Sequence, residues 1–162
     1  MLTFPNLQQR ANFRTAIGDA IVTRAATEFR ILAVVPTYRR AEIARQLAPV
    51  NADMLFVRHS AEASASIRED DVFQVALLPA TLTDTDWWEL WGVLALLKAR
   101  PAILVYAREA TFQLWSGVLE LGGYDVIVEP FSDSDLQNAV LRAAKSFAQR
   151  TANGPEQNGF SN

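Results

Sequence analysis

Cysteine is absent from the 162-residue chain, and His59 is its only histidine. The protein therefore contains no disulfide or thiolate metal site and offers no thiol nucleophile. One histidine is too few for a histidine-rich metal site or a histidine-based catalytic relay. No glycine-rich phosphate loop of the GxxxxGK or GxGxxG type follows the first apolar strand. We therefore expect no metal, no cofactor and no enzymatic activity.

An excess of positive charge and a long apolar run are also missing. The chain has 15 Lys and Arg against 18 Asp and Glu, a net charge of −3, and a pI of about 5.2. Such a balance gives no general attraction to nucleic acid or anionic lipid. The first residues, MLTFPNLQQR, lack the charged start and apolar core of a secretory signal, and no apolar stretch has the length of a bilayer span. We expect a cytoplasmic protein that binds neither nucleic acid nor a membrane.

The chain does contain a regular alternation of short apolar segments and longer helical patterns. This alternation is typical of right-handed βαβ crossovers, which build a parallel sheet. The predicted strands are residues 30–35, 53–57, 73–78, 102–106 and 125–128. Most are uninterrupted apolar runs, as expected for strands that helices cover on both faces. The sequence thus predicts one α/β domain over residues 29–150.

The two ends of the chain differ from this pattern. Within residues 1–28, apolar side chains such as Phe13, Ile17 and Ile21 recur at helical spacing, which predicts an amphipathic helix. Its apolar stripe packs either on its own domain or on a partner, and the sequence does not decide between them. Residues 151–162, TANGPEQNGFSN, are polar and rich in turn formers, which predicts a flexible tail.

The second half of the domain carries a family resemblance. The segments ARPAILVYARE and LELGGYDVIVEPFSDSDLQNAVLRAA resemble the fourth strand through the fifth helix of response regulator receiver domains, the family of the chemotaxis regulator. The resemblance covers residues 29 to about 150. It implies a flavodoxin-like doubly wound sheet of five parallel strands in the order 2-1-3-4-5, with the amino-terminal helix as an addition. It also implies a role in two-component signal transduction and a cis peptide bond before Pro130.

The residues that receiver domains use for phosphorylation are not recovered. In the family, two acidic residues after the first strand bind Mg²⁺, an Asp ending the third accepts phosphate, and a Ser or Thr and a Lys follow the fourth and fifth strands. The corresponding residues here are Pro36, Thr37, Pro79, Tyr106 and Glu129. Proline supplies neither a nucleophile nor a side-chain ligand, and Glu129 puts a negative charge where phosphate needs a cation. The resemblance therefore implies a pseudo-receiver without Mg²⁺-dependent phosphorylation.

Three tryptophans are candidates for protein contacts. Trp87 and Trp88 are adjacent, so on a helix they project about 100° apart and at least one is partly exposed. Exposed indoles such as these, and Trp115 further along, often anchor protein interfaces. The alternatives are ordinary core packing, or a lid formed by Trp87 over the emptied phosphorylation pocket.

Charged residues near the predicted strand ends have simpler interpretations. Asp84 and Asp86 are expected to start and cap the helix that follows the third strand, and a replacement metal or phosphoacceptor site is the alternative. Arg39, Arg40 and Arg45 are expected to form a solvated helix face.

The leading hypothesis is a phosphorylation-independent regulatory module that acts by protein contact. We expect a homodimer formed by the helix at 110–121, the strand at 125–128 and the last helix. The alternative is a sensor whose emptied cleft, lined by the five substituted positions, binds an uncharged or cationic small molecule.

Overall fold

Five parallel strands form the single sheet of this computed structural model, which describes residues 29–81 and 84–153. The sheet order is β2-β1-β3-β4-β5, which confirms the predicted flavodoxin-like topology. The strands are β1 (Arg30–Val34), β2 (Asp53–Val57), β3 (Val75–Pro79), β4 (Ala102–Ala107) and β5 (Asp125–Val128). The third strand is the main departure from the predicted boundaries, because it starts two residues later than expected and ends on Pro79.

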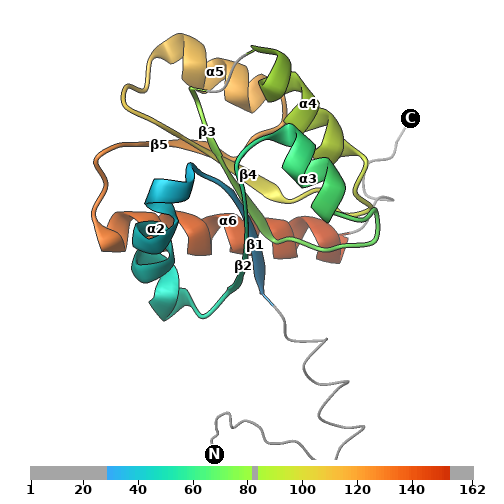
Figure 1. The fold of residues 1–162 in the computed structure, drawn as a ribbon, viewed down its shortest axis with the longest axis horizontal. Helices are drawn as coiled ribbons and strands as arrows, with labels where there is room; N and C mark the ends of the chain where they lie inside the picture. The colour runs from blue at the N-terminus through green and yellow to red at the C-terminus, as the bar shows by residue number, and fades with distance from the viewer. Residues whose placement is uncertain (1–28, 82–83, 154–162) are drawn as a thin grey trace, which may run out of the picture.

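Helices cover both faces of the sheet (Figure 1). The helices α2 (Arg40–Leu47) and α6 (Asp133–Asn153) pack on one face, and α3 (Ser60–Ser66), α4 (Asp84–Ala95) and α5 (Phe112–Glu120) pack on the other. Short 3₁₀ turns, η1 (Thr37–Arg39) and η2 (Ala48–Val50), flank α2. Successive strand residues alternate between the two cores: Ile31 and Ala33 face α2 and α6, while Leu32 and Val34 face the other three helices. The central strands are therefore fully buried, as their continuous apolar runs predicted.

The last helix extends further than the sequence suggested. It continues to Asn153, three residues into the range predicted as a tail. The Thr151 hydroxyl donates a hydrogen bond to the carbonyl oxygen of Phe147 at 3.1 Å, and the helix-breaking pair Gly154 and Pro155 comes only afterwards. The predicted amino-terminal helix lies outside the described residues. Within the described residues, no helix combines the length and apolar character that crossing a bilayer requires.

Two glycines terminate α5 and fix the start of β5. Gly122 has φ +92°, a conformation that favours glycine after a helix end. Gly123 packs so closely that a Cβ atom there would lie 2.5 Å from Cγ1 of Val118. The Gly-Gly pair therefore allows the chain to turn sharply from α5 into the edge strand β5.

Candidate functional site

A cavity of about 560 Å³ lies at the carboxyl edge of the sheet. Its lining includes all five positions that the sequence singled out: Pro36, Thr37, Pro79, Tyr106 and Glu129. They come from the ends of four different strands or the loops after them, which meet because carboxyl ends of parallel strands share one edge. The peptide bond between Glu129 and Pro130 is cis, the isomer expected from the sequence.

Tyr106 fills the centre of this edge. Its side chain is only 4% exposed, and its hydroxyl donates a 2.9 Å hydrogen bond to the carbonyl oxygen of Val34. Because β3 lies between β4 and β1, the phenol crosses the end of β3, where Pro79 pairs in register with Tyr106. Burial raises the pKa of Tyr106 well above its ordinary value, an effect that the Arg39 cation opposes and the Glu129 anion reinforces. Tyr106 is thus a neutral, fixed hydrogen-bond donor at physiological pH.

A Tyr106→Phe variant should lose about 1 kcal/mol of unfolding free energy at neutral pH, because the buried Val34 carbonyl loses its donor. In the wild type, the pKa of Tyr106 is higher in the folded protein than in the unfolded chain. The free energy of unfolding therefore declines above about pH 10, where the phenol of the unfolded chain ionises. The variant should lack that alkaline decline. Urea denaturation from pH 7 to 11 measures both effects. Tyr38→Phe is the control at neutral pH, because Tyr38 is 84% exposed; a Tyr106→Phe protein as stable as this control would contradict the expectation.

An ion pair joins the loops after β1 and β5. Nη1 of Arg39 donates to Oε1 of Glu129 at 2.9 Å, and these side chains are only 20% and 21% exposed. The 3₁₀ turn η1 delivers Arg39 to this place, since the Arg39 amide donates to the Pro36 carbonyl at 3.0 Å. The Arg39 guanidinium also lies 5.5 Å from the centroid of the Tyr106 ring. In receiver domains, acidic residues follow the first strand and a lysine follows the fifth. Here the charges are exchanged, with the cation after β1 and the anion after β5.

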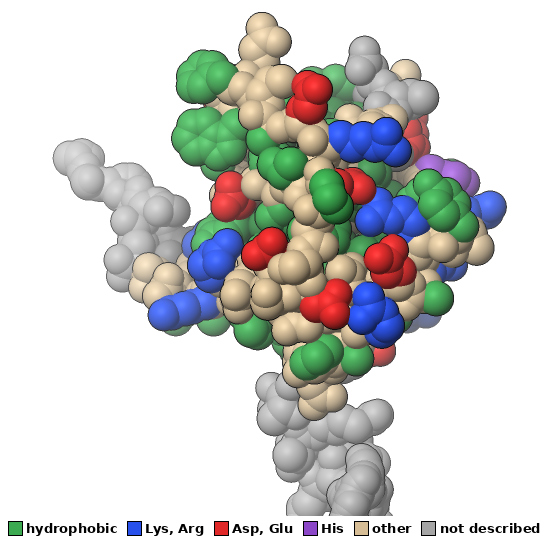
Figure 2. All heavy atoms as spheres, turned by 90° about the vertical axis from the view of Figure 1, so that its left-hand side faces the viewer, with side chains coloured by type: hydrophobic (Ala, Val, Ile, Leu, Met, Phe, Trp, Pro, Cys, Tyr) green, Lys and Arg blue, Asp and Glu red, His purple; other side chains and the backbone are tan. Residues whose placement is uncertain are grey.

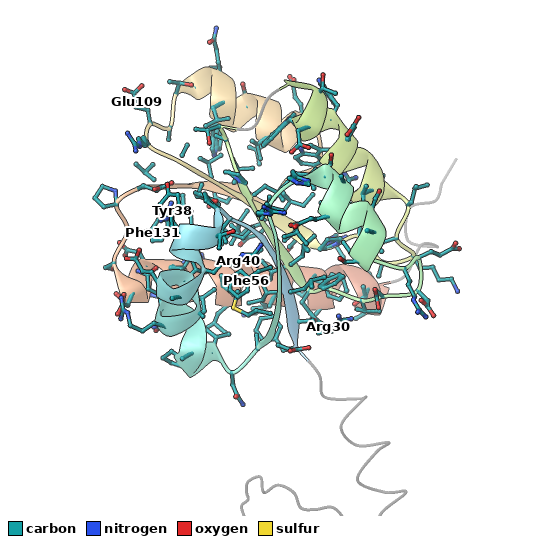
Figure 3. All side chains as sticks on the ribbon, viewed as in Figure 1. Arg30, Tyr38, Arg40, Phe56, Glu109 and Phe131 are labelled. Atoms are coloured by element: carbon teal, nitrogen blue, oxygen red, sulfur yellow. The ribbon has the colours of Figure 1, made fainter. Side chains whose placement is uncertain are left out.

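The predicted solvated arginine face is wrong for two of its three members. Arg39 is paired as described above. Arg40 lies over the Phe56 ring at 5.7 Å (Figure 3), and its Nη2 atom is 3.8 Å from Oε1 of Glu62. Arg45, at 62% side-chain exposure, does face solvent, where it contacts Asp133. Arg39 at the end of η1 and Arg40 at the start of α2 therefore contact side chains that follow β5 and β2 respectively.

Two further arginines line the cavity and were missed from the sequence. Arg58 directly follows β2 and Arg108 directly follows β4. Figure 2 looks onto this side of the molecule and shows Lys and Arg side chains gathered beside the only histidine, His59. Nε and Nη2 of Arg58 donate to Oε2 of Glu62 at 3.0 and 2.8 Å, which lowers the pKa of Glu62. Their position one or two residues after a predicted strand was the signal that could have identified both arginines.

The tryptophans lie away from this cavity. Trp87 contacts Trp91 in a tilted arrangement, with ring centroids 5.8 Å apart. Together with Trp88 it lines a second cavity of about 390 Å³ beside α5. Trp87 is not part of the lining of the first cavity, where the alternative of a lid would have placed it. Trp88 is 58% exposed, as the helical geometry predicted for at least one of the adjacent pair. Trp115 is 42% exposed and contacts Phe112 on the outer side of α5.

Asp86 connects two helices. Its Oδ1 atom accepts from the amide and the hydroxyl of Ser60 at 3.0 and 2.6 Å, and Oε1 of Glu89 lies 2.8 Å from the same hydroxyl. The helix α4 already begins at Asp84. Both carboxylates thus fasten the start of α3 to α4. Among the described residues, no group of three or more His, Asp or Glu side chains could hold a metal ion.

No protein-family model matches the chain, and no curated protein matches its sequence. Solved structures do match its fold. A CheY-like response regulator receiver domain from Methanospirillum hungatei is 20% identical, with a TM-score of 0.65 over 76% of this chain and 99% of that chain. The chemotaxis protein CheY4 from Vibrio cholerae is 18% identical, with a TM-score of 0.62 over 72% of this chain and 99% of that chain. An adenylate cyclase structure from Rhodopirellula baltica is 19% identical, with a TM-score of 0.66 over 78% of this chain and 94% of that chain. The described residues therefore have the receiver-domain fold.

Proposed function

We propose that this protein is a phosphorylation-independent regulatory module of the receiver type, which acts through protein contacts. The observation that carries the proposal is the occupied carboxyl edge of the sheet. The buried Tyr106 phenol spans β4 and β1 there, and the Arg39–Glu129 ion pair holds the adjacent loops. Both features stand where phosphorylated receivers keep an open, acidic and metal-binding cleft.

Phosphoryl transfer to the end of β3 has no chemical basis at this site. Transfer needs a nucleophilic oxygen, a metal to neutralise the developing charge and a cation for the phosphate. Pro79 supplies no oxygen, and the residues after β1 are Pro36 and Thr37, with no carboxylate between them. Glu129 adds a negative charge that Arg39 already neutralises. A phosphate group would also meet the Tyr106 ring.

The protein contact that we propose is a homodimer through α5, β5 and α6. Of the nine large apolar side chains that are exposed in the described residues, five belong to this face. They are Phe112, Trp115, Leu119, Val128 and Leu141. Exposed large apolar side chains are frequent in protein interfaces. β5 is an edge strand whose outer side no described strand covers. The same face was expected from the sequence.

Sedimentation equilibrium of the full chain, with and without acetyl phosphate and Mg²⁺, tests this proposal. We expect the mass of a dimer in both conditions, because no phosphoryl group is needed to build the face. A dimer that forms only with the phosphodonor would contradict phosphorylation independence. A monomer in both conditions would contradict self-association.

A further inference from the structure

We propose that the cavity at the carboxyl edge binds a small organic anion, a carboxylate or a phosphate ester, through Arg58 and Arg108. This proposal goes beyond the regulatory module described above, because a non-covalent ligand site needs neither phosphorylation nor a dimer.

The size and walls of the cavity suit a small molecule. Its volume of about 560 Å³ lies in the range of small-molecule sites, roughly 300–1,000 Å³. Pro36, Pro79 and Ala107 supply apolar wall, and the hydroxyls of Thr37 and Thr81 supply polar groups. Such a mixture of apolar wall and few polar groups is typical of ligand pockets. An inorganic ion alone would leave most of this volume unfilled.

The charge of the lining selects the ligand class. Arg39, Arg58 and Arg108 face a single lining carboxylate, Glu129, which gives the lining side chains a net charge of +2. Glu62 offsets part of this charge from α3, but the cations still outnumber the anions. The whole chain, by contrast, has a net charge of −3. A positive cavity in an acidic protein attracts anions to that one place.

Arg108 and part of Arg58 keep donors for a ligand. Arg108 is exposed and has no hydrogen bond or ion pair with any other described residue. Its neighbour Glu109 lies at the outside of the loop after β4 (Figure 3) and is not part of the lining. Arg58 binds Glu62 through Nε and Nη2, while its Nη1 atom has no hydrogen bond among the described residues. Arg39, in contrast, is already committed to Glu129.

Guanidinium groups recognise carboxylate and phosphate oxygens through charge-assisted, often bidentate hydrogen bonds. Tyr38, which also lines the cavity and is 84% exposed, offers an aromatic surface for the apolar part of such a ligand. The alternative of an uncharged or cationic ligand considered only the five substituted positions. We replace it with an anionic ligand because the lining also includes three arginines.

The experiment uses four probes that share a benzene ring: phenyl phosphate, benzoate, benzyl alcohol and benzylammonium. NMR titration of the full ¹⁵N-labelled chain should give saturable shifts of cavity amides, such as Thr37 and Arg108, with one or both anions. Benzyl alcohol and benzylammonium should bind at least about tenfold more weakly, because neither can accept a charge-assisted hydrogen bond from the arginines. Comparison of the affinities for phenyl phosphate and benzoate shows whether the site prefers a phosphate ester or a carboxylate. Equal binding of all four probes, tighter binding of benzylammonium, or no shift of cavity amides would overturn the proposal.

Matched variants test which side chains bind the anion. Arg108→Gln should weaken binding of the preferred anion by about tenfold or more, and Arg58→Gln should also weaken it. Arg142→Gln removes the same charge from an exposed position of α6 that is not part of the lining, and it should leave the affinity unchanged. All three sites are exposed, so the NMR spectra should remain those of a folded protein. Equal affinities of Arg108→Gln and Arg142→Gln for the anion would overturn the assignment.

Discussion

A Glu129→Lys variant is expected to lose about 2 kcal/mol of unfolding free energy, although lysine is the residue that phosphorylated receivers carry at this place. The substitution removes a charge-assisted hydrogen bond of 2.9 Å between partly buried groups and sets two cations against each other. Because domains of this size are stable by about 5–15 kcal/mol, the loss is a substantial part of the total. Urea denaturation of the full chain at neutral pH measures it.

The reversed pair supplies the decisive control. Arg39→Glu alone should be destabilising for the same reason, and the double variant with Glu129→Lys should recover most of the loss, because the two charges have only exchanged places. Asp133→Lys opposite Arg45 is the matched exposed pair, and its effect should be much smaller. If the loss of unfolding free energy in the double variant equals the sum of the losses in the two single variants, the two side chains do not interact. The ion pair would then not be what holds these loops.

Leu119→Asp is expected to turn the proposed dimer into a monomer, raising its dissociation constant by at least about a hundredfold. Leu119 is on α5 and is 38% exposed in the described structure, so its substitution affects the proposed face more than the core. An aspartate there would bury an unpaired charge in an apolar interface.

Leu96→Asp is the control for that substitution. Leu96 follows α4, outside the α5, β5 and α6 face, and is 78% exposed. We expect sedimentation equilibrium to report a dimer for Leu96→Asp and a monomer for Leu119→Asp. Dissociation of both variants, or of neither, would be evidence against the proposed face.

The strands and the place of the site were predictable because both depend on local pattern. Continuous apolar runs identified β2 and β5 with their observed ends, 53–57 and 125–128. Once the topology was known, the residues after each strand had to meet at one edge. This explains why Pro36, Thr37, Pro79, Tyr106 and Glu129 do line one cavity.

The contacts inside the site depend on long-range geometry that no local pattern contains. Arg39 and Glu129 are 90 residues apart in sequence, and they meet only because η1 turns the chain after Pro36 toward β5. Asp86 and Ser60 are 26 residues apart, and their hydrogen bond likewise joins two different helices. Trp87 contacts Trp91 one turn further along the same helix, so that contact follows ordinary helical spacing. The ion pair and the Asp86–Ser60 hydrogen bond are the tertiary contacts that no local pattern predicts.

Intact-mass measurement of the full chain after incubation with acetyl phosphate and Mg²⁺ tests the central claim of phosphorylation independence most directly. Pro79 offers no acceptor oxygen, Tyr106 crosses the end of β3, and the Arg39–Glu129 pair replaces the metal site and the lysine. We predict that the mass stays unchanged. A gain of one phosphate that hydroxylamine removes would show that an acyl phosphate forms on this protein, and it would contradict the account.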